Sequence, residues 1–410
     1  DHRDLHSFPT RRSSDLKLGE KAGKHFVAIT DPDTVLAKQA MEMKFRKVFY
    51  ADPTVGGRFS ALTSFGLVPA GLMGVELDTF IQKTKDFCEL CRPGVPVGRN
   101  PGLVLGVILA EAAKHGIDKL TIVAEEPFRS FGSWMEQLVA ESSGKNGKGI
   151  IPVDIEPFVD YQHYSKDRLF IYLKNDGIFA DRINELGSRN FPVLTYELTD
   201  PYDLGAEFFR WEFAIAVACA ILGINPFNQP DVQDNKNRTK QKIEQLIATG
   251  KFDFERPVFE NEAFAVFSHD EELEFAGKTL KQIIDSFLEN RETGDYVAIN
   301  AYTPRNKTTE SELQDFRKYV LSTTNLATTL GFGPRFLHST GQLHKGGPNT
   351  GLIIQIVDAS DESVDIPEMG LSFRDLILAQ SIGDYDALVN RKRRLIRIEL
   401  KKGRIQDFWQ

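Results

Sequence analysis

The chain has 410 residues, a net charge of −8 and three cysteines. The acidic balance disfavours nucleic acid and anionic membranes as partners, and no apolar run is long enough for a membrane-spanning helix. Three cysteines in so long a chain do not form a disulfide framework, so a reducing cytoplasm is the expected location. The length predicts roughly two to three domains.

Residues 1–16 have no apolar periodicity and are predicted to be a non-native or disordered leader. The part from His6 to Leu16 resembles the translation of a common sequencing-adapter oligonucleotide. We therefore exclude this segment from the folded protein and expect the true N-terminal part of the gene product to be missing.

From residue 17 onward, strand-like and helix-like segments alternate, which predicts an α/β fold with parallel sheets. The strand segments are short and rich in β-branched residues, at 25–30, 47–50, 120–124, 150–153, 168–173, 193–198, 296–302, 352–357 and 395–400. The helical segments have apolar residues at helical spacing, at 36–43, 61–74, 76–92, 103–114, 132–141, 178–186, 204–222, 237–248, 280–290, 310–323 and 373–388.

Two changes in composition predict domain boundaries. A proline- and glycine-marked connection at 93–100 separates a first domain, 17–92, from a second, 93–236. A charged helix and an irregular stretch follow residue 237, so 237–410 is predicted to be a C-terminal α/β region.

The helix expected at 132–141 carries the first candidate for chemistry. Gln137 and Glu141 are four residues apart and project from one face, one turn from each other. Ser142 and Ser143 end the helix, and Gly144 is predicted to form a left-handed cap. A carboxylate beside an amide at a helix end fits a proton-transfer group. An ordinary ion pair between Glu141 and Lys145 is the alternative.

Two further segments carry residues suited to binding an anion. Gly57 and Arg58 precede a helix, where backbone N–H groups and a guanidinium hold an oxyanion, or where a tight turn leaves the arginine in solvent. The pattern G-x-G-x-x-G of a dinucleotide site is absent there. Gln229 lies in an Asn-Pro-Phe-Asn-Gln-Pro stretch, with Lys236 downstream. Residues 334–347 are predicted to be a glycine-rich loop that contains His344.

These motifs resemble those of glucose-6-phosphate isomerase and occur in the same order. The matching strings are Val55-Gly-Gly-Arg-Phe-Ser60, Gln137-x-x-x-Glu-Ser-x-Gly-Lys145 and Asn225-Pro-Phe-x-Gln-Pro230 with Lys236. The stretch His338-Ser-Thr-Gly-Gln-Leu-His-Lys-Gly-Gly347 and the tail are similar to the isomerase module fused behind transaldolase in bacterial bifunctional enzymes.

The resemblance implies a three-layer αβα sandwich of the sugar-isomerase (SIS) type with a C-terminal α/β extension. It also implies a sugar phosphate substrate, a homodimer and a possible upstream transaldolase domain in the same chain. Glu141 would move the proton between C2 and C1, Arg58 would stabilise the enediolate, and Lys236 would assist ring opening. Gly57, Gln137 and Gln229 would bind substrate, and no metal or organic cofactor is expected.

The chain departs from the family pattern in two places. Residues 17–54 contain no Ser/Thr-rich phosphate loop, so the chain by itself is expected to be poorly active. Asp203 stands where many isomerases have a ring-opening histidine, which leaves Asp203 and His344 as alternatives for that role. Two other function classes stay open: a sugar-phosphate-binding module without catalysis, and a different aldose–ketose phosphate isomerase.

Overall fold

The computed structural model describes residues 17–270, 273, 275–359, 363–367 and 369–409, without the side chains of residues 20 and 232–236. The predicted leader, 1–16, therefore lies outside the described residues. The chain forms two compact units. The first contains the chain up to Val95 together with Tyr202–Glu212, and the second contains Pro96–Pro201 and Phe213–Gln410.

The first unit is built around a two-stranded parallel sheet. Strand β1 pairs with β2, with Val27 opposite Lys47 and Thr30 opposite Tyr50. Its elements are η1 (Gly19–His25), β1 (Val27–Thr30), α2 (Val35–Glu42), β2 (Lys47–Tyr50), η2 (Gly57–Phe59), α3 (Ser64–Leu72), α4 (Leu77–Leu90), η5 (Pro201–Asp203) and the start of α8 (Leu204–Leu222). Helix α3 has no buried residue although its sequence is mostly apolar.

A four-stranded parallel sheet forms the first part of the second unit, in the order β4-β3-β5-β6. Its elements are η3 (Val97–Arg99), α5 (Pro101–Lys114), β3 (Lys119–Ala124), α6 (Phe131–Ser143), β4 (Ile151–Asp154), η4 (Tyr161–His163), β5 (Arg168–Lys174), α7 (Ala180–Ser188) and β6 (Val193–Glu197). Helix α5 packs closely on α8, because a Cβ at Gly106 would lie 2.6 Å from the Ala214 carbonyl oxygen.

A six-stranded sheet in the order β10-β9-β11-β14-β8-β7 forms the rest of the second unit. Strands β10, β9, β11 and β14 are parallel, whereas β8 and β7 are antiparallel to their neighbours. The elements are α9 (Val232–Thr249), β7 (Phe259–Glu260), β8 (Phe264–Ser268), α10 (Leu280–Glu289), β9 (Tyr296–Tyr302), α11 (Lys307–Thr324), β10 (Ala327–Phe332), η6 (Arg335–His338), α12 (Thr340–Gly346), β11 (Gly351–Asp358), β12 (Asp365–Ile366), β13 (Leu371–Ser372), α13 (Phe373–Asn390), β14 (Arg394–Leu400) and η7 (Ile405–Phe408).

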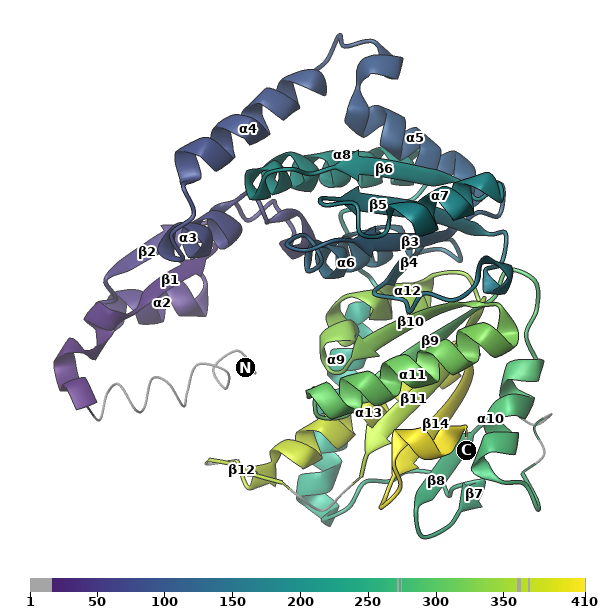
Figure 1. Ribbon diagram of the computed structural model, residues 1–410. Coiled ribbons are helices and arrows are strands. Elements are labelled where there is room, and N and C mark those ends of the chain that lie inside the picture. The colour runs from purple at the N-terminus through teal and green to yellow at the C-terminus, as the bar shows by residue number, and fades with distance from the viewer. Residues whose placement is uncertain (1–16, 271–272, 274, 360–362, 368, 410) are drawn as a thin grey trace. The chain divides into compact units, whose positions relative to one another are not determined.

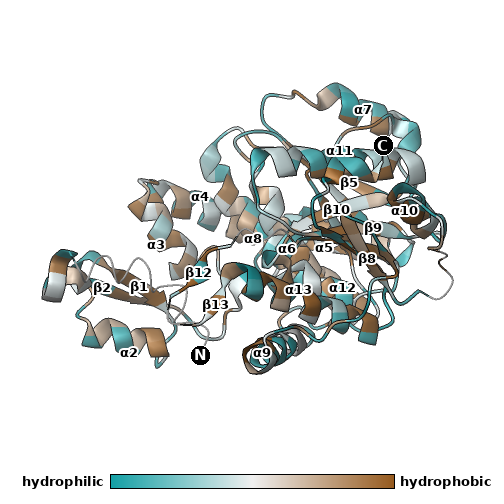
Figure 2. Ribbon diagram, turned by 90° about the horizontal axis from the view of Figure 1, so that it is seen from below, coloured by the Kyte–Doolittle hydropathy of each residue, from teal (hydrophilic) through white to brown (hydrophobic). Residues whose placement is uncertain are grey.

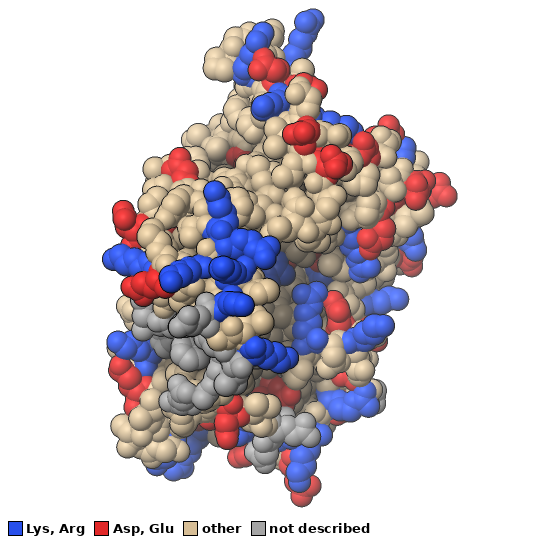
Figure 3. Space-filling view, turned by 90° about the vertical axis from the view of Figure 1, so that its left-hand side faces the viewer, with Lys and Arg blue, Asp and Glu red and all other residues tan. Residues whose placement is uncertain are grey.

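Helices cover both faces of the six-stranded sheet, so this region has three layers (Figure 1). On one face, α10, α11 and η7 bury a cluster that includes Ile284, Phe316 and Phe408. On the other face, α13 contributes Tyr385 and Leu388, and α9 packs against α13. Figure 2 shows the hydrophobic strands at the centre of this region and polar faces on α9. Both basic and acidic side chains occur on the face seen in Figure 3.

The predicted α/β class with mostly parallel sheets is confirmed, and β2, β9 and α8 have the predicted bounds. Three local predictions are wrong. The antiparallel strand β8 lies in a stretch predicted to be irregular, because its Phe-Ala-Val-Phe-Ser run is too short to show a period. Residues 340–346 form helix α12 where a loop was predicted. Gly144 has φ −76°, which is not left-handed. The predicted boundary at 237 falls inside the second unit.

Candidate active site

Helix α6 places Glu141 at its buried C-terminal end. Met135, Leu138 and Val139 are fully buried and hold the helix in the core. Gln137 Nε2 donates a hydrogen bond to Glu141 Oε2 at 3.3 Å, as the four-residue spacing predicts. Glu141 is only 7% exposed, so its carboxylate is oriented by a neighbouring amide in a largely water-excluded place.

The chain leaves α6 through a tightly packed turn. The Ser143 hydroxyl donates to the Val139 carbonyl at 2.8 Å and accepts from the Ile150 N–H at 2.9 Å. A Cβ at Gly144 would lie 2.4 Å from Leu343 Cα on α12. Glycine is therefore needed at position 144 by the close approach of another backbone, and the left-handed backbone lies two residues later, at Asn146.

Gln342 on α12 joins three segments that are far apart in the sequence. Its Nε2 donates to the Gly144 carbonyl at 2.9 Å and to Asp231 Oδ2 at 2.7 Å, and its Oε1 accepts from the Asp231 N–H at 3.0 Å. The side chain is fully buried. Gln342 thus fixes the exit of α6, three residues after Glu141, to the end of the Asn-Pro-Phe-Asn-Gln-Pro stretch.

Two lysines that follow α6 bind to the end of α8 and to the segment after it. Lys145 Nζ donates to the Asn225 carbonyl at 2.5 Å and is 3% exposed. Lys148 Nζ donates to the Leu222 carbonyl at 2.8 Å. Lys145 therefore holds the segment that carries Gln229, which is itself exposed. The backbone of Lys236 belongs to α9, but its side chain lies outside the described residues.

The environment of His344 differs from that of an exposed loop histidine. It is 5% exposed on α12, and its Nδ1 lies 3.4 Å from Asn300 Nδ2. Burial, and then the neighbouring Lys345 ammonium, lower the pKa of His344 to about 3. Lys345 is also buried and pairs with Asp384 at 2.7 Å. His344 is therefore neutral near pH 7 and serves there as a hydrogen-bonding group.

The remaining candidates belong to the first unit. Arg58 in η2 is 4% exposed, and its guanidinium lies 5.4 Å from the centre of the Phe59 ring. Gly57 precedes it, and a Cβ there would meet no atom within 4 Å. Asp203 in η5 accepts from Lys83 Nζ at 2.8 Å. The structure thus brings Gln137 and Glu141 together within the second unit, and it places Gly57, Arg58 and Asp203 in the first.

Sequence reasoning missed two features around α6. Gln342 lies in the stretch 338–347, in which the sequence pointed only to His344. Its hydrogen-bond partners, Asp231 and Gly144, lie 111 and 198 residues away in the sequence. Glu136 on α6 and Asp154 at the end of β4 form a buried pair of carboxyl groups that no sequence motif predicted. No group of three or more His, Cys, Asp or Glu residues in the described parts of the chain could hold a metal ion.

Comparisons with known proteins find relatives that match part of the chain. No family model matches the chain. Relatives named glucose-6-phosphate isomerase match about half of it. The protein of Lactobacillus helveticus is 26% identical over 258 residues, which cover 53% of this chain and 58% of that protein. Those of Parabacteroides distasonis and Listeria monocytogenes are 26% and 27% identical, each with 58% of its length covered.

Solved structures with partial likeness include a hypothetical protein of Thermus thermophilus, at 12% identity and a TM-score of 0.28, which covers 86% of this chain and 89% of that one. The C-terminal domain of glucosamine-fructose-6-phosphate aminotransferase from Francisella tularensis has 11% identity and a TM-score of 0.21, with 80% and 90% covered. No helix in the described ranges is long and apolar enough to cross a membrane.

Proposed function

We propose that the chain carries the base-bearing part of a glucose-6-phosphate isomerase, which interconverts glucose 6-phosphate and fructose 6-phosphate through an enediol(ate). The observation that carries the proposal is the buried Gln137–Glu141 pair at an end of α6 that is fixed by Gln342. Relatives with that name, matched over 58% of their length, support it.

In this reaction Glu141 removes the proton from C2 and returns it to C1. One carboxylate suffices because both carbons present the same face of the planar intermediate. The Gln137 amide orients the Glu141 carboxylate, and a positioned base of this kind contributes about 100- to 10,000-fold to the rate. Arg58 offsets the charge on the enediolate oxygens, while Gly57 and Gln229 contact the substrate.

Ring opening is assigned to Lys236 with Asp203 or His344. A group that protonates the ring oxygen must exchange a proton near neutral pH. The low pKa of His344, about 3, makes it a poor proton donor near neutral pH and leaves it a hydrogen-bonding role. Asp203 stays the candidate by its position in the sequence. We further propose that the protein acts as a cytoplasmic homodimer, and that a transaldolase domain belongs to the same polypeptide.

The test is Glu141→Gln in a version extended to the full length of the relatives, assayed from fructose 6-phosphate with glucose-6-phosphate dehydrogenase as the coupling enzyme. The amide keeps the shape but accepts no proton, so kcat should fall at least about 100-fold while substrate affinity stays nearly unchanged. Glu111→Gln, on the exposed face of α5, is the matched control.

Other outcomes would reject Glu141 as the base or point to a different function. Near-normal turnover of Glu141→Gln would reject Glu141 as the base. Binding of fructose 6-phosphate without any turnover, by a version extended to the full length of the relatives, would point to a sugar-phosphate-binding module. Faster turnover of mannose 6-phosphate would point to a different aldose–ketose isomerase.

A further inference from the structure

The C-terminal region binds the segment that carries Gln229. Asp231 lies two residues after Gln229 and directly precedes α9. Its Oδ2 accepts from Gln342 on α12 at 2.7 Å, and its Oδ1 accepts from the Arg391 guanidinium, just after α13, at 3.0 Å. Hydrogen bonds to a charged group are roughly twice as strong as those between neutral groups. Both oxygens of this carboxylate are therefore held by residues far along the chain.

The same Gln342 side chain also holds the exit of α6. Its Nε2 donates to the Gly144 carbonyl at 2.9 Å, three residues after Glu141. Gln342 is fully buried, so removal of its amide would leave these buried groups without their partner. We refer to Gln342, Arg391, Asp231 and the Gly144 carbonyl as the clamp.

Three segments meet closely at Gly346, the last residue of α12. A Cβ at this position would lie 2.5 Å from Asp231 Oδ2 and 2.7 Å from the Gly144 carbonyl oxygen. The Gly346 carbonyl accepts from the Gly147 N–H at 2.9 Å. Any larger residue at 346 would displace the exit of α6 or the segment before α9, so α12 determines the positions of both.

The two donors of the clamp are also fixed to each other. Arg393, two residues after Arg391, donates to the carbonyls of Lys345 at 2.6 Å and of Gly347 at 2.8 Å, at the end of α12. Lys345 in turn forms a buried ion pair with Asp384 of α13. A support that is itself held in place keeps a reacting group close to its productive geometry.

We propose that Gln342 and Arg391 are positioning residues for the proton transfer by Glu141, and that the C-terminal region is part of the catalytic unit. This inference rests on the proposed isomerase function. Gln342 acts through the Gly144 carbonyl, which fixes the end of α6, and both residues act through Asp231, which fixes the segment between Gln229 and α9. A displacement of about 1 Å at a reacting group can cost about 100-fold in rate.

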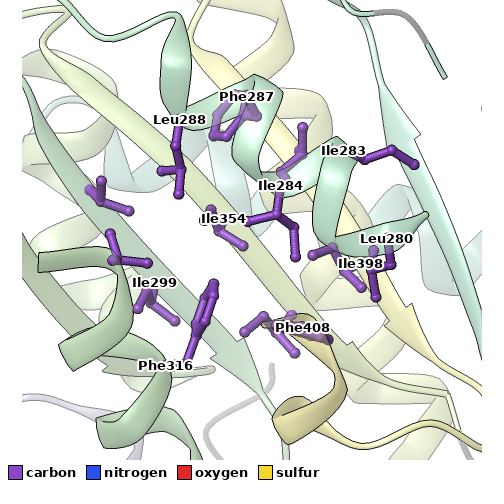
Figure 4. Packing of buried hydrophobic residues seen from close by; sticks show 14 of the residues in the cluster. Leu280, Ile283, Ile284, Phe287, Leu288, Ile299, Phe316, Ile354, Ile398 and Phe408 are labelled. Atoms are coloured by element: carbon purple, nitrogen blue, oxygen red, sulfur yellow. The ribbon is translucent and has the colours of Figure 1, made fainter. Parts of the chain in front are cut away.

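The main core of the C-terminal region lies apart from the clamp. Figure 4 shows the cluster that packs α10, α11 and η7 on the six-stranded sheet, with Ile284, Phe316 and Phe408 among its members. None of the clamp residues is among the described residues of this cluster. We therefore expect the region to stay folded when the clamp is altered.

The test is Gln342→Met in the version extended to the full length of the relatives. Methionine keeps the shape of glutamine but makes none of its three hydrogen bonds. We expect kcat from fructose 6-phosphate to fall about 10- to 100-fold with KM nearly unchanged, and Arg391→Met to give a smaller loss.

Gln355→Met is the matched control. Gln355 is also fully buried and makes three hydrogen bonds, with Ser381, Asp384 and Arg397, but it is not part of the clamp. Urea denaturation should show a similar loss of stability in the two variants, whereas kcat should stay near that of the parent protein in the control.

Uptake of deuterium from solvent measures the proton transfer itself. 5-Deoxyfructose 6-phosphate lacks the hydroxyl that closes the ring, so uptake at its C1 needs the base but no ring opening. Because Glu141 acts on both sugars, Gln342→Met should slow this uptake as much as it slows turnover.

A second substitution at Asp231 provides a rescue. In Gln342→Glu a carboxylate that cannot donate faces Asp231, and kcat should fall at least about 100-fold. Addition of Asp231→Asn supplies a donor from the other side of that contact and should restore about 10-fold of the lost activity.

Four results would overturn the proposal. Turnover of Gln342→Met equal to that of the parent protein would exclude positioning by Gln342. An equal loss of kcat in Gln355→Met would mark the effect as general destabilisation. Unchanged deuterium uptake would place the effect on ring opening, and absence of rescue would exclude Asp231 as the link. A parent protein without any isomerase turnover would instead reject the proposed function, and this inference with it.

Discussion

Two sites with buried carboxyl groups lie at the carboxyl edge of the four-stranded sheet, and the pKa values of their carboxyl groups are shifted in opposite directions. Glu125 directly follows β3, and Asp154 ends the adjacent strand β4, where it meets Glu136 of α6. All three side chains are at most 8% exposed. They differ in the number of hydrogen-bond donors around them.

Glu125 is surrounded by donors. Its Oε2 accepts from the N–H groups of Asn175 and Gly177, each at 2.8 Å, and its Oε1 accepts from the Phe179 N–H and the Tyr172 hydroxyl. Burial alone would raise its pKa, but these four donors outweigh burial and lower the pKa to about 2. The carboxylate anchors the loop between β5 and α7 in its charged form.

The pair formed by Glu136 and Asp154 has few donors. The Ser133 hydroxyl donates to Asp154 at 3.1 Å, and Arg335 approaches Glu136 only to 3.9 Å. Burial, and then the Asp154 charge, raise the pKa of Glu136 to about 7, and burial raises that of Asp154 to about 6. For these three carboxyl groups, which are similarly buried, the number of hydrogen-bond donors decides the direction of the pKa shift.

The largest expected effect comes from Glu125→Gln. Glutamine has one acceptor oxygen where glutamate has two, and its NH₂ group would face donors that need an acceptor. About half of the four hydrogen bonds to residue 125 would therefore be lost. We expect the free energy of unfolding at pH 7 to fall by about 4 kcal/mol, measured by urea denaturation. The matched control is Glu126→Gln at the neighbouring exposed position. A loss within 1 kcal/mol of the control, on the order of a surface change, would contradict the anchoring role.

The effect of Glu125 also depends on pH. Its folded-state pKa, about 2, is below the ordinary value of 4.5, so the stabilisation is present above pH 4.5 and is lost as the pH falls toward 2. The unfolding free energies of the parent protein and of Glu125→Gln should therefore converge in acid.

Glu136→Gln should have the opposite sign. The folded-state pKa of about 7 lies above the ordinary 4.5, so the parent protein loses stability as the pH rises from 4.5 to 7. Glutamine imitates the protonated acid, and the shift corresponds to a gain of about 3 kcal/mol at pH 8 and almost none at pH 4.5. Urea denaturation at the two pH values measures this, and a loss of stability at pH 8 would show that Glu136 is ionised and well paired.

A double substitution sharpens the comparison further. The Asp154 charge contributes to the raised pKa of Glu136, so relieving either carboxyl relieves part of the same repulsion. At pH 8, Glu136→Gln with Asp154→Asn should be less stabilising than the sum of the single changes by about 1 kcal/mol. Additive free energies would mean that the two groups do not interact.

The smallest effect is expected for Ser133→Ala. Its hydroxyl is the donor that partly offsets the burial of the Asp154 carboxylate. Stability at pH 8 should fall by about 0.5–1 kcal/mol, and at pH 4.5, where Asp154 is protonated, by less. A ¹³C titration of the Asp154 carboxyl should show its pKa raised further by the substitution, and an unchanged pKa would exclude Ser133 as its donor.

Much of the fold was predictable from the chain itself. Strands β2 and β9 and helix α8 have the predicted bounds. Short runs of apolar and aromatic residues and a long apolar helix are local signals of secondary structure. The hydrogen bond between Gln137 and Glu141 was predictable for the same reason, since a spacing of four residues is a property of one helix.

The partners of these elements were decided by the tertiary structure. Gln342 reaches Gly144 across 198 residues, and the close contact of Gly144 with Leu343 makes glycine necessary there. Glu125 directly follows strand β3, and Glu136 lies on helix α6. The neighbouring sequence gives no sign that the pKa values of these two glutamates shift in opposite directions. Their opposite pKa shifts arise from donors at Tyr172, Asn175 and Phe179 that only the fold brings to one of them. Local sequence indicates the helices, the strands and the spacing within one helix, whereas the free energy of a buried charge depends on the groups that folding places around it.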